Sequence, residues 1–401
     1  MILGVLKETK NPPDKRVAIT PSIAKKIIET YPEIKIIVQP SDIRVIQDKE
    51  YFETSITLSN DLSNCDILIG IKEVAKETFI PNKTYMFFSH TGKKQPHNRA
   101  MLQRCAELNI TLIDYEYLTD DNNVRLIAFG RWAGIVGAYN TLYTFGLKTK
   151  LYKLKRAYEC YDHYELFQQL EHINLPPIKI LITGGGRVAN GALETIKNAR
   201  IKEISPEEFL NKTYNEAVFC RLDPWHYVKH KNGIAFDLQH FFDNPEEYES
   251  NFIPYALQTD VYIPCHYWDP RSPEFLKPED YLLPGFHIKV IGDISCDIGK
   301  PIASTLRPST IANPIYGYNP ITRQEDDFLK EGNIAVMAID NLPAELPRSS
   351  SEDFAETFYN KIIPELINIE KSKVIERATI LKNGKLTTQF QYLANYLAGK
   401  E

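Results

Sequence analysis

Short apolar runs alternate with amphipathic segments along the first third of the chain, and this pattern predicts an α/β protein. Five runs have the length and the β-branched or aromatic content of buried strands: 2–6, 34–38, 67–71, 85–88 and 110–114. Between them, residues 23–31 and 98–107 carry apolar side chains at helical spacing, and Thr20-Pro21 has the residue types of an N-cap and a first helical position. Strands that alternate with helices predict a mostly parallel sheet with helices on its faces.

The pattern changes near Arg131, where a helical stretch rich in Tyr, Leu and Lys extends to about His172 and marks the passage into a second domain. Pro176-Pro177 ends it, and strand-like runs return: 178–183, 201–205, 216–220, 261–265, 288–291 and, from about residue 332, a further alternating run. Near the end, residues 354–367 form an amphipathic stripe that we expect to begin at a serine cap and to bend at Pro364.

A glycine turn follows the strand at 178–183. Gly184-x-Gly186-x-x-Ala189 matches the dinucleotide fingerprint and has the strand–turn–helix context that the fingerprint requires. Glycines there let the backbone approach a pyrophosphate, which the helix N-terminus attracts. We expect this turn to bind the cofactor, and the alternative is a purely structural turn; the candidate residues are Gly184, Gly185, Gly186, Arg187 and Val188.

The next expected strand ends in Ser205-Pro206, without the acid that binds a ribose hydroxyl in this type of site. Glu203 is nearby, but the alternation of the strand can direct it elsewhere. A 2′-phosphate would therefore not be repelled, and the cofactor is NAD(H) or NADP(H).

Two titratable residues follow neighbouring strands of the first domain. Lys72 closes the run at 67–71, and His90 comes just after the run at 85–88. Residues past the carboxyl ends of strands line the ligand crevice of an open α/β sheet, so we expect Lys72 and His90 to form an acid/base pair. The alternatives are a solvated lysine and a histidine that fixes a loop. Arg16 lies in the first loop at the same edge, and Asp293 follows a later strand, where a turn-capping role competes with contact to the nicotinamide.

Composition excludes several classes of protein. The chain has 401 residues, 43% of them apolar, and a formal charge of −5, so it lacks a basic field for nucleic acid. No apolar run approaches the roughly 20 residues of a membrane span, and the N-terminus does not resemble a signal peptide. Four of the six cysteines lie in apolar segments (Cys65, Cys105, Cys220 and Cys265), which predicts reduced, buried thiols and a cytoplasmic protein.

His226 and His230 have the i, i+4 spacing of a helical metal pair, but no glutamate follows His226 directly. We expect no metal.

Several longer stretches resemble one family within the alanine dehydrogenase and transhydrogenase superfamily, whose opening signature is similar to RVAITP at 16–21. The family comprises the lysine–2-oxoglutarate reductase half of α-aminoadipic semialdehyde synthase and the fungal lysine-forming saccharopine dehydrogenases. The stretches are GIKE (70–73), FFSHTGKKQP (87–96), IDYEYLTDDNNVRLIAFGRWAG (113–134), TGGGRVANGA (183–192), HYWDP (266–270), GDISCD (292–297) and IDNLPAELPRSSSEDF (339–354). The glutamate-forming half of the bifunctional enzyme is expected to have no counterpart before the chain ends at Glu401.

The resemblance implies two Rossmann-like domains with mostly parallel sheets facing a central cleft. Residues 1–135 plus about 325–401 would form the substrate and catalytic domain, and 136–324 the dinucleotide-binding domain. It implies the reaction of saccharopine, NAD(P)⁺ and water to give L-lysine, 2-oxoglutarate and NAD(P)H, with Lys72 and His90 as the acid/base pair. The glycine turn and the following ISPEEF look more like the bifunctional reductase, which uses NADP(H), than like the fungal NAD enzyme.

The substrate of that reaction carries three carboxylates and two nitrogens, so its site calls for arginines and acids. Arg16, Gln95, Arg125 and Phe129 match ligand-contacting positions of the fungal enzyme, although Val124 replaces one of two adjacent arginines in the fungal pattern. Arg16 and Arg125 are the expected carboxylate clamps. Glu73 and Glu116 are expected to balance Lys72 or to hold the substrate ammonium. Each of these charged residues has a plain surface ion pair as its alternative.

Two other functions remain open at this point. One is an alanine-dehydrogenase-like enzyme that oxidises a primary amine, and the other is a catalytically silent sensor of lysine or a dinucleotide. The expected partners are small molecules only (saccharopine, lysine and 2-oxoglutarate), with neither nucleic acid nor membrane, and a homodimer is possible.

Overall fold

The computed structural model describes residues 1–400 and divides the chain into two compact units. The first unit contains residues 1–129 and the segment from 347 onward, and the second is the continuous stretch Gly130–Leu346. The family resemblance implied these boundaries near 135 and 325. The second boundary lies later in the structure because β16 (Ile334–Met337) pairs with β13 (Val290–Gly292) in the sheet of the second unit.

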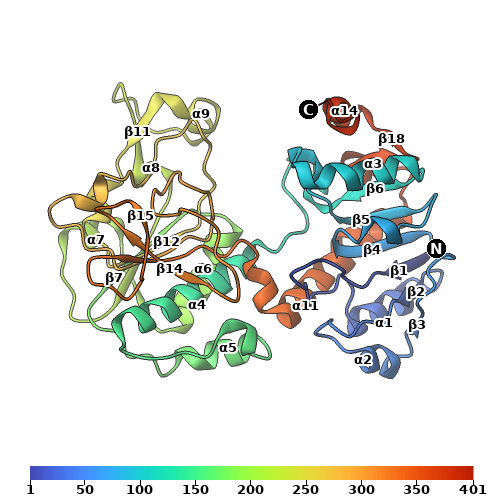
Figure 1. Ribbon diagram of the computed structural model, residues 1–401, viewed down its shortest axis with the longest axis horizontal. Helices are drawn as coiled ribbons and strands as arrows, with labels where there is room; N and C mark the ends of the chain where they lie inside the picture. The colour runs from blue at the N-terminus through green and yellow to red at the C-terminus, as the bar shows by residue number, and fades with distance from the viewer. Residues whose placement is uncertain (401) are drawn as a thin grey trace. The chain divides into compact units, whose positions relative to one another are not determined.

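The sheet of the first unit is mostly parallel. Within residues 1–400 its strand order is β18-β17-β6-β5-β4-β1-β2-β3, and β17 and β18 are its antiparallel members. The strands are β1 (Ile2–Val5), β2 (Lys35–Val38), β3 (Thr57–Leu58), β4 (Ile67–Lys72), β5 (Thr84–Phe88), β6 (Thr111–Asp114), β17 (Thr379–Lys382) and β18 (Lys385–Leu386). The last two come from the C-terminal segment, which extends the sheet beyond β6 (Figure 1).

The helices of the first unit contribute apolar residues to the same core as this sheet. They are α1 (Pro21–Thr30), α2 (Asp48–Glu53), α3 (Arg99–Glu107), α11 (Pro347–Thr357), α12 (Ile363–Ile367), α13 (Lys373–Ala378) and α14 (Ala394–Leu397). The predicted serine cap of the late helix is wrong, because α11 begins at Pro347 and Ser349–Ser351 lie inside it. The bend expected at Pro364 stays a prediction; a π-helical turn, Phe358–Ile362, precedes that proline.

The sheet of the second unit has the order β15-β14-β16-β13-β12-β7-β9-β8 in the described residues and is also mostly parallel. Its strands are β7 (Lys179–Thr183), β8 (Lys202–Glu203), β9 (Val218–Leu222), β12 (Val261–Pro264), β13, β14 (Ile315–Asn319), β15 (Gln324–Asp326) and β16. β10 (Val228–His230) and β11 (Tyr248–Ser250) form a separate antiparallel pair. Two units with mostly parallel sheets confirm the predicted α/β class.

The helices of the second unit are α4 (Gly130–Thr149), α5 (His163–Leu170), α6 (Arg187–Asn198), α7 (Pro206–Asn211), α8 (Pro224–Tyr227), α9 (Leu238–Asp243) and α10 (Ile253–Ala256). The helical stretch expected from 131 to 172 is therefore two helices with a loop between them. Glycines allow α4 and α6 to pack backbone against backbone: a Cβ on Gly134 would lie 1.9 Å from the carbonyl oxygen of Val188.

None of the helices in residues 1–400 has both the length and the hydropathy needed to cross a membrane.

Candidate active site and dinucleotide turn

The strand order of the first unit places Lys72 at a topological switch point. From the neighbouring strands β1 and β4, the strand order continues through β2 and β3 toward one side of the sheet and through β5 and β6 toward the other. Loops that leave such a pair on opposite sides open a crevice at the carboxyl ends of the strands, which is where open α/β sheets bind ligands. Lys72 is the last residue of β4, and it pairs with Phe88 at the end of β5.

The predicted acid/base residues are in contact. Nζ of Lys72 lies 3.1 Å from Nε2 of His90, and Nδ1 of His90 lies 3.6 Å from Oε1 of Glu116. When the Lys72 ammonium donates to Nε2, the proton of the ring sits on Nδ1 and faces the Glu116 carboxylate. The three side chains thus form a path of contacts that begins with the Lys72–His90 hydrogen bond and ends at the charge of Glu116.

Burial and charge adjust the acidity of this path. Burial lowers the pKa of Lys72 below its usual range, and the positive charges of Arg16 and Lys10 lower it further. Burial by itself would raise the pKa of Glu116, but the hydrogen bond with His90 and the charge of Lys93 outweigh it and lower that pKa to about 2. Lys72 is therefore a better base than an exposed lysine, and Glu116 stays ionised.

Glu8, which the sequence patterns did not single out, holds the end of β4. Its two carboxylate oxygens accept the backbone N–H groups of Ile71 at 2.7 Å and Lys72 at 2.9 Å. The register of β4 against β5 shifts between Ile69 and Lys72, so these two hydrogen bonds fix an irregular strand end. Burial raises the pKa of Glu8 to about 8. The only signal in the sequence is an acid two residues after the predicted strand at 2–6.

Arg16 lies inside the same unit and not on its surface. Its side chain is 2% exposed, makes a bidentate pair with Asp14 at 2.9 and 2.5 Å, and stacks 4.2 Å from the centre of the Phe129 ring. Burial acts to raise the pKa of Asp14, but the Arg16 guanidinium lowers it to about 2. The predicted pair of Arg16 and Phe129 is thus brought together, with Asp14 as a partner that the sequence did not reveal.

The other predicted substrate residues lie on either side of Lys72 and His90. Nη2 of Arg125 is 3.8 Å from Glu116, and its Nε donates to the Glu116 carbonyl at 3.1 Å. Glu73 pairs with Lys10 at 2.6 Å instead of Lys72, and its other carboxylate oxygen is buried without a partner among the described residues. Gln95 follows in the loop after His90, and its side-chain oxygen accepts from Asn98 at 3.3 Å.

The predicted dinucleotide turn adopts the geometry that its glycines allow. Gly184 has a φ of +110°, and a Cβ there would lie 2.7 Å from the carbonyl oxygen of Cys265. Gly186 is the N-cap of α6, which begins at Arg187 and continues through Val188. A Cβ on Gly186 would meet nothing within 4 Å, so the start of this helix has open space where a phosphate would sit. The residues present therefore fit a dinucleotide.

An acid that the sequence patterns missed lies beside this turn. The dinucleotide fingerprint predicts it at the end of the next strand in the chain, β8, but β9 is the strand that pairs with β7, and β8 lies at the edge. Asp223 follows β9 directly, and a Cβ on Gly185 would be 2.8 Å from its Oδ1. Arg221 pairs with Asp223 at 2.7 Å. Asp223 thus occupies the place from which an acid reaches the ribose in this type of site.

Asp293 is fully buried after β13. Its carboxylate accepts from the backbone amides of Ser295 and Cys296, both at 3.1 Å, and from the hydroxyls of Ser295 and Thr305, both at 2.6 Å. Burial raises its pKa above the usual range. Such contacts are those of a carboxylate that organises a turn.

His226 and His230 do not share a helix, because α8 ends at Tyr227 and His230 belongs to β10. His230 instead meets His240 and Glu247, with ligand-type atoms within 4.8 Å of one another. Nδ1 of His230 accepts the backbone N–H of Asn232 at 3.1 Å, so Nε2 carries the ring proton and donates to Glu247 at 3.2 Å. A metal ligand needs the opposite tautomer, so this cluster is a hydrogen-bonded one.

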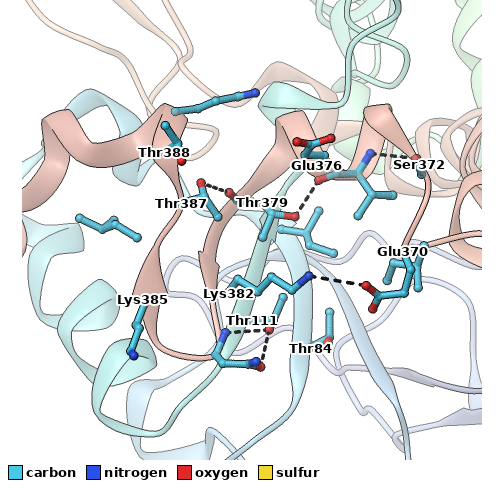
Figure 2. Close-up of a pocket in the computed structure, with 16 residues that line it drawn as sticks. Thr84, Thr111, Glu370, Ser372, Glu376, Thr379, Lys382, Lys385, Thr387 and Thr388 are labelled. Carbon is cyan, nitrogen blue, oxygen red and sulfur yellow. Dashed lines mark hydrogen bonds and ion pairs between the residues drawn. The ribbon is translucent and has the colours of Figure 1, made fainter.

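A groove with a volume of about 790 Å³ lies at the amino-terminal ends of β5 and β6 in the first sheet (Figure 2). Thr84 and Thr111, which begin β5 and β6, line it together with residues 369–389 of the C-terminal segment. Lys382 and Glu370 pair there at 3.6 Å. Because His90 follows the opposite end of β5, this groove and the Lys72–His90 pair are at opposite ends of the strand.

Comparisons with known proteins agree with the fold. Residues 4–136 match the family model of the alanine dehydrogenase/PNT N-terminal domain. The whole chain is 28% identical to the mitochondrial α-aminoadipic semialdehyde synthase of Bos taurus, of which it spans about half, 48% of the length. Over 96% of the chain it is 25% identical to the lysine-forming, NAD(+) saccharopine dehydrogenase of Neurospora crassa, of which it covers 97%.

A solved structure of an L-alanine dehydrogenase superimposes on 99% of this chain and 100% of its own with a TM-score of 0.68, at 14% sequence identity. That likeness extends the two-unit α/β fold beyond the matched N-terminal segment. The resemblance of the sequence to the saccharopine dehydrogenase family, within the alanine dehydrogenase and transhydrogenase superfamily, is thereby confirmed.

Proposed function

We propose that the protein is a nicotinamide-dinucleotide-dependent oxidoreductase that interconverts saccharopine with L-lysine and 2-oxoglutarate. The observation that carries this proposal is the contact of Lys72, of lowered pKa, with His90 at the switch point of the first sheet. The Neurospora crassa relative, which is named for this chemistry, matches 96% of the chain and supports the choice of substrate.

In the oxidative direction, Lys72 accepts the proton of the secondary amine of saccharopine. The bound dinucleotide supplies the hydride acceptor. His90 then takes a proton from the water that adds to the resulting protonated imine, and returns it to the nitrogen of the carbinolamine. The C–N bond breaks, lysine leaves, and the carbinolamine hydroxyl loses its proton to become the keto oxygen of 2-oxoglutarate. The path from Lys72 through His90 to Glu116 keeps these protons within one chain of contacts. General acid/base groups in such positions contribute about 10²–10⁴-fold to a rate.

Arg16 and Arg125 serve as the carboxylate clamps for the substrate in this proposal, with Gln95 and Phe129 beside them. Asp14 already fixes the guanidinium of Arg16, which sets the direction that this group faces. The partnerless carboxylate oxygen of Glu73 fits the substrate ammonium or a water molecule, and Glu116 balances His90.

The cofactor residues are the turn Gly184–Val188 and, in this proposal, Asp223. A carboxylate next to Gly185 accepts the ribose hydroxyls of NAD(H) and repels the 2′-phosphate of NADP(H), and the Arg221 charge is balanced by its pair with Asp223. We therefore propose NAD(H) as the preferred cofactor. The contacts of Asp293 favour a turn-organising role over direct contact with the nicotinamide. The cytoplasmic location and the homodimer stay predictions.

The deciding experiment follows NADH and NADPH absorbance with lysine plus 2-oxoglutarate, and in parallel with pyruvate plus ammonia. Oxidation with the first pair alone is the expected result. Turnover of the second pair would identify an alanine-dehydrogenase-like enzyme. Absence of turnover with every combination, together with measurable binding of lysine or dinucleotide, would identify a sensor.

A further inference from the structure

The loop after β5 has a backbone that its own residues do not favour. His90 and Lys94 both adopt a φ of +53°, in the left-handed region, and neither is a glycine. Side chains are sterically disfavoured there, although histidine enters the region more often than most residues. Residues persist in such conformations where the surrounding structure holds them. The neighbours of residues 90–98 therefore have to hold this loop in shape.

The beginning of the loop is anchored to the sheet. Ser89 donates its backbone N–H at 3.0 Å and its hydroxyl at 2.5 Å to the buried carboxylate of Asp114, at the end of β6. These bonds fix the residue before His90. They leave the stretch from Gly92 to Asn98 to be held by other means.

Two tyrosines of the C-terminal segment hold this stretch by hydrogen bonds. The hydroxyl of Tyr392 donates to the carbonyl oxygen of Gly92 at 3.1 Å, and the hydroxyl of the buried Tyr396 donates to the carbonyl oxygen of Gln95. Both tyrosines belong to residues 388–397, which we call the C-terminal strap. Figure 1 shows its helix α14 beside α3, where Gln103 donates to the carbonyl of Leu397 at 2.8 Å.

Aromatic residues also pack against the same loop. A Cβ on Gly92 would lie 1.7 Å from Oη of Tyr117 and 3.1 Å from Oη of Tyr392, so only glycine fits between the two hydroxyls. The Tyr117 ring packs edge-on against Phe390 of the strap, with ring centres 4.8 Å apart. The contacts of Gly92 and Tyr117 therefore depend on where the strap lies.

We infer that Tyr392 and Tyr396 are positioning residues, through which the C-terminal strap holds the His90 loop in its left-handed shape and keeps the imidazole between Lys72 and Glu116. The effect on turnover rests on the proposed function; the effect on the loop does not. Residues some 300 positions apart in the sequence are joined by these bonds, so the last part of the chain sets the geometry of a catalytic group.

The test replaces the two hydroxyls and keeps the rings, in Tyr392→Phe, Tyr396→Phe and the double variant. Tyr359→Phe is the matched control, since that hydroxyl bonds to Thr30 at 3.1 Å elsewhere in the same unit. Hydrogen–deuterium exchange is measured on peptides that cover residues 90–98. The amides of Lys94 and Asn98, which bond within the loop, are expected to exchange about tenfold faster in the double variant and unchanged in the control.

Gly92→Ala forces a Cβ against the Tyr117 hydroxyl, 3.1 Å from that of Tyr392, and is expected to give the same exchange pattern. For turnover of lysine plus 2-oxoglutarate, the double variant should lower kcat about tenfold, move the pH profile and leave the KM for the dinucleotide unchanged. Unchanged exchange in the folded double variant would overturn the inference. Faster exchange in the double variant, together with a wild type that shows no turnover, would support the role of the strap and reject the proposed function.

Discussion

Lys72 and His90 meet at two backbone irregularities. Glu8 holds the shifted end of β4, and His90, whose φ is left-handed, places its Nε2 3.1 Å from Nζ of Lys72. A non-glycine residue in such a conformation costs about 1–3 kcal/mol. The pair thus depends on contacts outside its own two strands, and substitution of either residue isolates its chemical role.

Lys72→Met and His90→Gln should each lower kcat about 10²–10⁴-fold while dinucleotide binding is retained, because each removes a proton-transfer group and keeps most of its volume. Steady-state kinetics and fluorescence titration with NADH measure the two effects. Lys35→Met and His172→Gln, at exposed positions, are the matched controls. Normal turnover in either site variant would remove that residue from the mechanism.

The buried carboxyl of Glu8 predicts a dependence of stability on pH. Its pKa is raised from 4.5 to about 8, so between these values the unfolded chain has lost a proton that the folded protein retains. The free energy of unfolding should therefore fall as the pH rises through this window, by up to about 1.4 kcal/mol per pH unit. In Glu8→Gln the slope should flatten, which urea unfolding at pH 5–8 measures. Glu29→Gln, at an exposed position, should keep the slope of the wild type.

Some of these residue contacts could be predicted from the sequence and others could not. Lys72 and His90 follow recognisable strands, and parallel strands end at a common edge. Glu8 and Asp14 lie in a polar stretch, KETKNPPDKR, whose composition is that of a solvated loop. Their burial depends on the fold of the loop over the sheet, which has no periodic signal.

At the scale of elements, two contacts characterise the second unit: Asp223 lies against the glycine turn, and α4 packs closely on α6. β9 lies between β7 and β8 and brings Asp223 to the glycine turn, while glycines bring α4 against α6. The sequence predicted most of the strands, but β8 and β9 come in chain order and carry nothing that says which one pairs with β7. For that reason the expected acid was sought at the wrong strand. The loop between α4 and α5 was missed because apolar and tyrosine residues continue through it.

Asp223→Ala should reverse the preference for the cofactor. It removes the acceptor for the ribose hydroxyls and leaves Arg221 without its partner, next to the turn. NADH is expected to bind about tenfold more weakly and NADPH about tenfold more tightly, since Arg221 is then available to a 2′-phosphate. Fluorescence titration with both cofactors measures this, and Asp243→Ala is the control at an exposed site. Equal losses for both cofactors would contradict the role of Asp223 in discrimination.

Alanine at Gly134 or Gly191 should destabilise the second unit by about 2 kcal/mol or more. A Cβ at either position would lie 1.9 Å from a carbonyl oxygen of the facing helix, so α4 and α6 would have to move apart. Thermal unfolding followed by circular dichroism measures the loss. Lys197→Ala on the exposed face of α6 should change the free energy of unfolding by no more than about 0.5 kcal/mol.

At the scale of the whole molecule, the second unit is continuous in the chain and the first is not. Strand β17 of the last segment covers β6, and Phe354 and Phe358 of that segment pack on Tyr115, with ring centres 5.2 and 6.4 Å apart. The sequence foresaw a first domain completed by the C-terminal segment only through its family resemblance, since no local pattern states which sheet a late strand joins.

A fragment of residues 130–346 should therefore fold alone, with a cooperative thermal transition and binding of NADH. Residues 1–129 alone should not, because β6 loses β17, one of its two neighbouring strands, and the core loses the aromatic residues of α11. Circular dichroism of the two fragments measures this, and adding a peptide of residues 347–400 to the fragment of residues 1–129 should restore its transition. Cooperative unfolding of residues 1–129 without the peptide would show that the last segment is dispensable for that core.

The discontinuous first unit also has a consequence for synthesis on the ribosome. Its last strand emerges only after all of residues 130–346 have been translated, so at about 5–20 residues per second the nascent first unit waits on the order of 10–40 s for its partner segment. During that time the second unit can complete its fold, while β6 presents an open edge. A chaperone that binds exposed strands would thus meet the beginning of this chain for longer than its middle.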